Sequence, residues 1–473
     1  MLSYLSNTWL ALTCIPLVIK TTVFHVLGIS ATSQKWDLQI ALTVTLLRKL
    51  LLDGPPRTIS EQQAMFMKDA GIDKKTWASK VVFEAPPEDA LRQLLSQLLT
   101  ASSKGPSDDY REPELEPVSG EWIGYRNDDA PDTPKSEQEE SEREKYDHLA
   151  AQAQSNVTVL YFHGGSLYLM DPISTRPVAA KMASLCKGPV FSLRYRLAPQ
   201  KPFPSALLDG LIAYMSMLYP PPGSFHEAIP ASSIVLAGDS AGGNLCMSLL
   251  QLMLSAHRAS PSETPRVMFH GRLREIPLPA GITLGSASLD LTRSLRGEGA
   301  DLYDYLQPPP YSPVISPPCD VWPTIPRRPD LYTEGSLLSH PFVSPMAAPS
   351  WKGAPPILFC CGEEYVADEN KVVAQKAARQ GVQVVWEQYE AMPHCFPLLF
   401  AHAGVSKAAF EQWSKFVDMA VNNSSGIETS GVFVTIKDVK KQSVDVKELQ
   451  ELNDAETDER MEKARLEIVA RYG

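Results

Sequence analysis

Basic residues are outnumbered in this chain: 44 lysines and arginines stand against 55 aspartates and glutamates, giving a formal net charge of −11 at pH 7. Affinity for nucleic acid comes mainly from neutralising phosphates with lysine and arginine. The charge balance therefore argues against a nucleic-acid-binding protein. The acidic residues gather at positions 128–147 and in the tail at 438–473, where lysines and arginines are mixed in.

Cysteine is also infrequent. The chain has seven cysteines, an odd number, and their spacing matches neither a zinc site nor a disulfide framework. Scattered thiols of this kind are commonly buried or incidental, and they favour a reducing compartment. The cysteine pattern thus predicts no metal centre.

No long apolar run is free of interruption. The most apolar stretch, residues 9–29, has the length of a membrane-spanning helix, but Pro16, Lys20 and His25 interrupt it. No basic residue precedes the run and no clear small-residue cleavage site follows it, so a secretory signal is not expected. Three alternatives stay open for residues 1–30: a spanning anchor, a helix in the membrane interface, or a helix buried against the protein. The first two make the protein membrane-associated, which we expect.

The segments that flank the centre of the chain differ from it in composition. Residues 31–126 carry helical patterns at 36–52 and 88–99 and end in a strand-like piece, so a helical cap region is expected there. Residues 127–155 are polar and acidic, which predicts a flexible surface insertion. Residues 423–473 are polar as well, and we expect a peripheral tail that ends in a charged helix.

Residues 156–422 alternate short β-branched runs with helical segments, which is typical of a mainly parallel sheet flanked by helices. The expected strands are 157–162, 190–195, 234–237, 282–285, 357–361 and 382–389. Two stretches interrupt the alternation: a loop of uncertain shape at 259–279 and a proline-rich insertion at 302–345. A long loop inside a compact domain is commonly functional or disordered, and we expect the insertion to contribute to the cap.

The most informative pattern is Gly-Asp-Ser-Ala-Gly-Gly at residues 238–243, which follows an apolar strand and opens a helical segment. A nucleophilic serine must stand on a tight strand-to-helix turn, and only small neighbours such as Gly238 and Gly242 leave room for it. The start of a helix also favours developing negative charge. The pattern predicts Ser240 as a nucleophile, with an ordinary glycine-rich turn as the alternative.

A second pattern, His-Gly-Gly-Ser at residues 163–166, comes directly after the expected strand 157–162. Consecutive glycines let backbone N–H groups point at a carbonyl oxygen without interference from a Cβ atom. Together with the amide of Ala241, the amides of Gly164 and Gly165 would form an oxyanion hole. A plain strand-ending turn is the alternative.

Hydrolases with such a serine present an acidic residue and then a histidine later in the chain, each on a loop after a strand. His394 directly follows the last expected strand, and His402 is its competitor farther along. The acidic residue predicted here is Asp368, after the strand 357–361. Three other acidic residues in that stretch compete with it: Glu363, Glu364 and Glu369.

These motifs, in this order, resemble the hormone-sensitive-lipase family of α/β hydrolases over residues 157–421. The resemblance rests on His163-Gly164-Gly165, Tyr195-Arg196-Leu197-Ala198-Pro199, Pro202-Phe203-Pro204-Ser205-Ala206, Asp209-Gly210, the motif at 238–243, Leu289-Asp290-Leu291-Thr292, Ser344-Pro345, Asp368-Glu369 and His394. The apolar N-terminus and the region around Trp36 are similar to fungal members such as steryl acetyl hydrolases. In one departure, the family's Asp-x-Leu-x-Asp-Glu pattern reads Glu-Tyr-Val-Ala-Asp-Glu at 364–369.

The resemblance implies an α/β-hydrolase fold with a helical cap, and a serine esterase that works through an acyl-enzyme. His394 would be the general base for Ser240, and Asp368 would orient and stabilise its imidazolium. No metal or organic cofactor is implied. The substrate would be a small apolar ester, and acetylated sterols, acylglycerols and acetylated secondary metabolites all stay open.

Two alternatives to an esterase stay open. Ser166 replaces the family's usual third glycine, a change also found in its non-catalytic branch, the plant gibberellin receptors, so a ligand-binding receptor is one alternative. An amide or peptide hydrolase is the other, because it would use the same triad.

The location also has two alternatives: Lys35, Arg48 and Lys49 after the apolar run favour the cytosolic face of a membrane, whereas the fungal relatives suggest the lumen of the endoplasmic reticulum.

Overall fold

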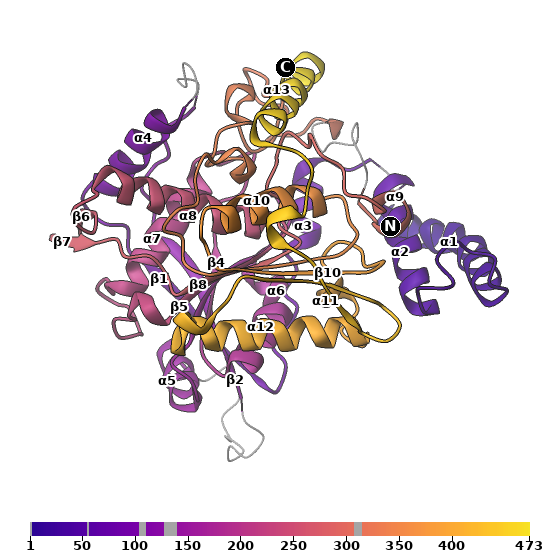
Figure 1. Cartoon of the computed structure of the whole chain (residues 1–473), viewed down its shortest axis with the longest axis horizontal. Coiled ribbons are helices and arrows are strands. Elements are labelled where there is room, and N and C mark those ends of the chain that lie inside the picture. The colour runs from indigo at the N-terminus through magenta and orange to yellow at the C-terminus, as the bar shows by residue number, and fades with distance from the viewer. Residues whose placement is uncertain (1, 54–55, 104–109, 127–139, 307–314) are drawn as a thin grey trace.

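A ten-stranded sheet runs through the middle of the molecule (Figure 1), as seen in a computed structural model that describes residues 2–53, 56–103, 110–126, 140–306 and 315–473. The strand order is β1-β2-β4-β3-β5-β8-β9-β10-β11-β12. The bounds are β1 (Thr76–Phe83), β2 (Val118–Tyr125), β3 (Thr158–Phe162), β4 (Val190–Arg194), β5 (Ile234–Asp239), β8 (Gly281–Gly285), β9 (Ile357–Cys361), β10 (Val384–Tyr389), β11 (Ser430–Val434) and β12 (Lys441–Ser443). All neighbours from β4 to β11 are parallel, and β1, β2 and β12 pair antiparallel at the two edges.

Helices cover both faces of the sheet. One layer holds α7 (Ser205–Leu218), α8 (Ala241–Ala259) and α10 (Ala367–Arg379), and the opposite layer holds α6 (Pro172–Cys186) and α12 (Gly404–Asn422) (Figure 1). Along β5 the buried side chains alternate between the two layers: Ile234 and Leu236 join the first, and Val235 and Ala237 join the second. Burial on both faces explains why the strand reads as a continuous apolar run.

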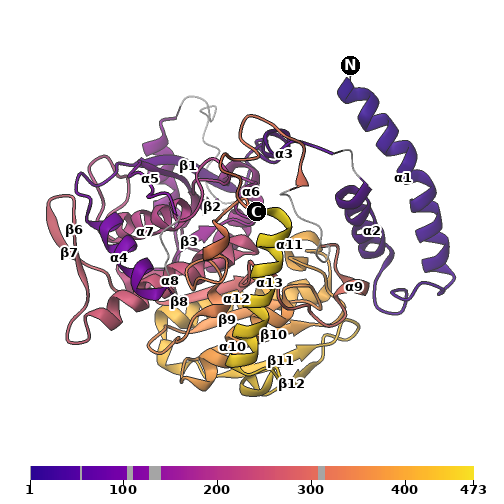
Figure 2. The same ribbon diagram turned by 90° about the horizontal axis from the view of Figure 1, so that it is seen from above.

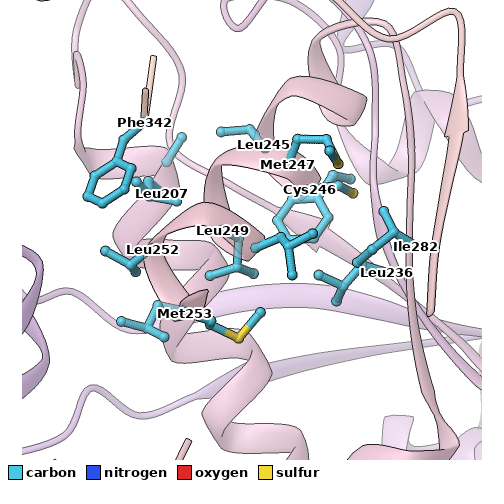
Figure 3. Close-up of a cluster of buried hydrophobic side chains, with 14 of the residues drawn as sticks. Leu207, Leu236, Leu245, Cys246, Met247, Leu249, Leu252, Met253, Ile282 and Phe342 are labelled. Carbon is cyan, nitrogen blue, oxygen red and sulfur yellow. The ribbon is translucent and has the colours of Figure 1, made fainter. Parts of the chain in front are cut away.

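The helix that follows the predicted nucleophile lies at the centre of the larger core. Figure 3 shows side chains of α8, among them Leu245 and Leu249, packed against Leu236 of β5, Ile282 of β8 and Leu207 of α7. All five of these side chains are at most 1% exposed. The turn before α8 is therefore anchored on both sides by packed structure, which keeps the position of its serine well defined.

The N-terminal region forms a helical hairpin at one side of the sheet (Figure 2), made of α1 (Leu2–Val26) and α2 (Leu38–Asp53). The indole N–H of Trp36, just before α2, donates to the carbonyl of Ala391 over 2.6 Å. Two shorter helices follow, α3 (Ile59–Phe66) and α4 (Ala90–Ser102). Among the helices in the described residues, none has the length and apolar character needed to cross a membrane.

The insertion expected to be flexible is partly an ordered helix. Residues 127–139 lie outside the described residues, but α5 (Glu142–Gln152) packs on β1 and β2, and Leu149 is buried against Gly124. Ser141 and Glu144 form a capping box that stabilises the start of this helix. The prediction of flexibility is therefore wrong for residues 140–152, because a charged helix needs only a few apolar contacts to dock.

Three other segments differ from the expectation or sharpen it. The loop at 259–279 contains a hairpin of β6 (Arg266–Phe269) and β7 (Arg272–Glu275). The tail is not only peripheral, because β11 extends the central sheet beside β10, before the helix α13 (Asp454–Tyr472). The described part of the insertion at 302–345 has little regular structure beyond α9 (Ala300–Tyr303) and a few short turns, yet Trp322, Tyr332 and Phe342 are buried in the main core.

Candidate active site

Ser240 stands on the sharp turn between β5 and α8. Its backbone has φ 51° and ψ −119°, a combination that costs energy for any residue with a Cβ atom and is kept where the surrounding structure enforces it. A Cβ atom on Gly242 would collide with the carbonyl of Phe162, and one on Gly238 would collide with Gly242 itself. The small neighbours predicted from the sequence are therefore required by the packing, and they hold the serine on a strand-to-helix elbow.

His394 lies beside the serine hydroxyl. Its Nε2 is 2.9 Å from Ser240 Oγ, and the side chain is almost completely buried. The loop after β10 carries it, and two hydrogen bonds to that loop hold its backbone: the amide of His394 donates to Asp304 over 3.2 Å, and the amide of Cys395 donates to Ser286 over 2.9 Å. The structure thus brings together the two residues that the sequence paired. His402, the competitor, is on the surface beside Asp37.

The acidic residue at the histidine is Glu364. Its Oε2 lies 2.6 Å from His394 Nδ1, and its other oxygen accepts from Ser286 Oγ over 2.7 Å and from the amide of Gly362 over 2.9 Å. The carboxylate is fully buried, and each of its oxygens has a partner. These contacts fix the imidazole so that Nε2 faces the serine hydroxyl, the arrangement of a Ser-His-acid triad.

The prediction that Asp368 contacts His394 is wrong. Asp368 lies in the first turn of α10, where its carboxylate pairs with Lys371 over 2.9 Å. The other two acidic candidates bind backbone amides of other loops: Glu363 accepts a hydrogen bond from the amide of Ala391, and Glu369 accepts one from the amide of Leu289. Asp368 and Glu369 lie in α10, which has already begun, and of the two acids in the loop directly after β9 it is Glu364 that contacts the base.

The sequence did contain information that singles out Glu364. It occupies the first acidic position of the family's pattern at 364–369, in which glutamate replaces the usual aspartate. It is also only three residues beyond the end of β9, whereas α10 begins at Ala367. Its place in that pattern, rather than its distance from the strand, separates it from Glu363, which lies one residue nearer to the end of β9.

The predicted oxyanion-hole residues surround the elbow. Phe162 at the end of β3 pairs with Gly238 of β5, which brings the His163 loop directly against the serine turn. Ala241 is the first residue of α8, where backbone N–H groups have no partner inside the helix. Gly165 has φ 106°, a conformation that favours glycine. Burial raises the pKa of Asp239, and hydrogen bonding from the backbone of Gly164 counteracts part of that rise.

His163 has a structural role in that loop. Its ring stacks on Tyr195 with 4.3 Å between ring centroids, and its Nδ1 lies 2.7 Å from the carbonyl of Gly164. Burial lowers the pKa of His163 to about 4, so the ring is neutral at physiological pH. The packed imidazole therefore fixes the shape of the loop.

Asp304 is a further carboxylate at the site that the sequence reasoning missed. One of its oxygens accepts a hydrogen bond from the amide of Tyr365 over 2.9 Å, and the other accepts from the amide of His394 over 3.2 Å. Tyr365 directly follows the acid Glu364, and His394 is the base. Burial raises the pKa of this carboxyl group, and the neighbouring His394 opposes the rise. Its backbone carbonyl accepts from Arg48 Nε of α2 over 2.8 Å. Asp304 therefore connects the loop of Glu364, the loop of His394 and the N-terminal hairpin.

The pH dependence of turnover should report the charge on His394. Burial works against the charged imidazole, but the neighbouring Cys395 and Glu364 outweigh it and raise the pKa of His394 well above its usual value. A base must be neutral to accept a proton, so kcat/KM should increase with pH and level off only above that raised pKa. In Glu364→Gln the pKa should fall, and the rising limb should move to lower pH in a stopped-flow pH profile. A limb at the same pH in both proteins would contradict the role of Glu364.

No group of three or more histidine, cysteine, aspartate or glutamate side chains within the described residues is arranged to hold a metal ion. All seven cysteines carry free thiols.

The sheet order and the serine elbow define the class of the protein, an α/β hydrolase. A family model described as the α/β-hydrolase fold matches residues 159–398, just over half of the chain. A structure titled as an esterase from the bacterial hormone-sensitive lipase (HSL) family has a TM-score of 0.51 and 20% identity, covering 82% of this chain and 99% of that one. At that identity the likeness supports the fold alone.

Two curated relatives add sequence similarity. An acetyl-hydrolase of Streptomyces hygroscopicus is 29% identical over 250 residues, which are 51% of this chain and 68% of that protein. Hormone-sensitive lipase of Homo sapiens is 37% identical over 98 residues, which are 20% of this chain and 9% of the human protein. The chain belongs to the hormone-sensitive-lipase family of α/β hydrolases, and with it to the carboxylic ester hydrolases. The predictions of fold, family and enzyme class are confirmed.

Proposed function

We propose that the chain hydrolyses carboxylic esters in two steps, through an acyl-enzyme formed on Ser240. The observation that carries the proposal is the continuous hydrogen-bonded line from Ser240 Oγ through His394 to Glu364, with distances of 2.9 and 2.6 Å. A serine hydroxyl is a weak nucleophile by itself and needs a base within hydrogen-bond reach, oriented by a third group. Glu364, rather than Asp368, is the orienting acid.

In the first step His394 Nε2 accepts the proton of Ser240 while Oγ attacks the ester carbonyl. The imidazolium then donates this proton to the leaving alkoxide, so that the alcohol departs and the acyl group stays on Oγ. In the second step His394 accepts a proton from water, the resulting hydroxide attacks the acyl carbon, and the carboxylic acid is released as Oγ recovers its proton. The buried carboxylate of Glu364 stabilises the imidazolium throughout and does not take its proton.

The negative oxygen of the tetrahedral intermediate needs N–H donors beside Ser240. We assign the main role to the amides of Gly165 and Ala241. Gly164 packs directly against the Asp239 carboxylate, with no room for a Cβ atom, so we give its amide a smaller part in the predicted oxyanion hole. The partial positive charge at the start of α8 adds to the stabilisation of the oxyanion.

The substrate we propose is an ester with an apolar alcohol or acyl part. The aromatic ring of Tyr305 lies 6.1 Å from the His394 ring, measured between centroids, and supplies an apolar wall beside the reacting atoms. The Streptomyces relative is named as an acetyl-hydrolase, which favours acetyl esters within this class. Acetylated sterols and acetylated secondary metabolites are candidates on this ground.

A panel of chromogenic substrates tests the function. The purified chain should hydrolyse p-nitrophenyl acetate and butyrate, with a burst of p-nitrophenol if deacylation is the slower step. It should leave the matched anilide, p-nitroacetanilide, intact over the same period. Rapid cleavage of the anilide would favour an amide hydrolase instead. No cleavage of any ester, together with tight binding of an apolar ligand, would favour a receptor.

A further inference from the structure

One side of α1 exposes a row of apolar side chains. Ile15, Ile19, Val23 and Val26 are between 45% and 72% exposed. Their spacing of four, four and three residues places them along one face of an α-helix. We call these four residues the apolar stripe. Phe24 and Leu27, also exposed, widen it.

The opposite side of α1 is the one that packs. Thr13, Leu17, Val18, Thr21 and His25 are partly covered, in step with the helical repeat. The packing partner is α2, and Figure 2 shows α1 as the outermost helix on this side, separated from the sheet by α2. The apolar stripe therefore faces away from the protein, where large exposed apolar surface marks an interaction site.

The charge of this region differs from that of the rest of the chain. The first 36 residues contain no aspartate or glutamate, although the whole chain has a net charge of −11. Of their two lysines, Lys35 pairs with Glu390, and Lys20 of α1 lies among the exposed positions, with its Nζ 5.6 Å from the centre of the Phe24 ring. An apolar row beside the cation Lys20, in a segment without acidic residues, fits a surface with an apolar interior and negatively charged headgroups.

We propose that the apolar stripe docks on the surface of an anionic lipid bilayer, with α1 lying in the plane of the interface. A helix of this kind buries its apolar side chains at the boundary between headgroups and acyl chains, and a lysine beside them, here Lys20, attracts anionic lipids. The interfacial alternative for residues 9–29 is thus the one that the exposed side chains support.

The hairpin that carries the stripe contacts the catalytic loops, while the stripe itself faces away from them. Trp36 and Arg48 connect the hairpin to Ala391 and Asp304, and Asp304 holds the amide of His394. The N-terminal hairpin and the catalytic loops are therefore joined by direct contacts. The substrate class that follows is an ester dissolved in the membrane, and this extension rests on the proposed function.

Vesicle flotation tests the docking surface without depending on catalysis. The variants are the double substitution Ile19→Glu with Val26→Glu, which places charge in the stripe, and the control Leu273→Glu. Leu273 on β7 is 59% exposed against 58% for Ile19, and β7 lies at the far side of the molecule from α1 (Figure 2). The vesicles are phosphatidylcholine alone, or phosphatidylcholine with a third of the lipid replaced by phosphatidylserine.

The wild type and Leu273→Glu should float with the phosphatidylserine vesicles, and the double variant should float roughly tenfold less. Circular dichroism and thermal unfolding check that all three proteins are folded, and p-nitrophenyl acetate reports catalysis separately. Equal flotation of all three proteins, or none by the wild type, would overturn the docking site. Equal flotation on neutral vesicles would overturn its anionic character. A wild-type dimer that the double variant dissociates would show that a second copy covers the stripe.

Discussion

Ser240→Ala should lower kcat/KM for p-nitrophenyl acetate by roughly 10⁶-fold, which corresponds to about 8 kcal/mol of transition-state stabilisation. Alanine removes the only atom that can form the acyl-enzyme and leaves His394 without a proton to accept. Alanine tolerates the backbone of the elbow as serine does, because both have a Cβ atom, so the fold should survive. Initial rates measured at high enzyme concentration check the residual activity.

Ser184→Ala is the matched control, because Ser184 is outside the site and its hydroxyl only donates to the carbonyl of Lys181. This variant should hydrolyse the ester at the wild-type rate. If Ser240→Ala keeps more than about a hundredth of the wild-type rate while folded, a different nucleophile carries the reaction, because triad serines in other hydrolases contribute several orders of magnitude more.

The second large effect separates the two acidic candidates. Glu364→Gln should lower kcat/KM by roughly 10⁴-fold, about 5 kcal/mol, because the amide keeps the size of the side chain but no longer stabilises the imidazolium or selects its tautomer. Asp368→Asn should change kcat/KM by less than about threefold, because the substitution removes only the pairing with Lys371. Both substitutions exchange a carboxylate for an amide of equal shape, so each controls for the other.

Steady-state kinetics with the two purified variants, at a pH above the raised pKa of His394, gives the comparison. Thermal unfolding accompanies it, because Glu364 is buried and holds Ser286 and Gly362 as well as the histidine. A folded Glu364→Gln with nearly full activity, beside an inactive Asp368→Asn, would restore the assignment made from the sequence and contradict the geometry.

The nucleophile and the base could be placed from the sequence because each depends on a local rule. Ser240 is flanked by glycines that the turn requires, and His394 follows the strand predicted at 382–389, which the structure has at Val384–Tyr389. The acid was harder because four carboxylates lie within seven residues. Knowing where β9 ends and α10 begins would leave Glu363 and Glu364, and such boundaries are the least certain part of a sequence-based prediction. Choosing between these two requires their side-chain contacts.

The fold was predicted well where both faces of a strand are buried, as in β3, β5 and β9, because the apolar runs are continuous. It was predicted poorly where burial is partial. In β11 only Gly431 and Val434 are buried, so the strand resembles the polar tail around it. Asp304 was missed for a different reason. It holds the amides of two residues that are more than 60 positions away in the chain, and no local sequence pattern predicts such contacts.

Labelling with a fluorophosphonate shows whether Ser240 is an activated nucleophile, because the reagent forms a covalent bond with such a serine and with few other side chains. Wild-type protein should gain one phosphonate, and peptide mass spectrometry should locate it on Ser240. The label should be absent from Ser240→Ala, and it should form far more slowly in Glu364→Gln than in Asp368→Asn. A label on another residue, or none in a protein that still cleaves p-nitrophenyl acetate, would contradict the account.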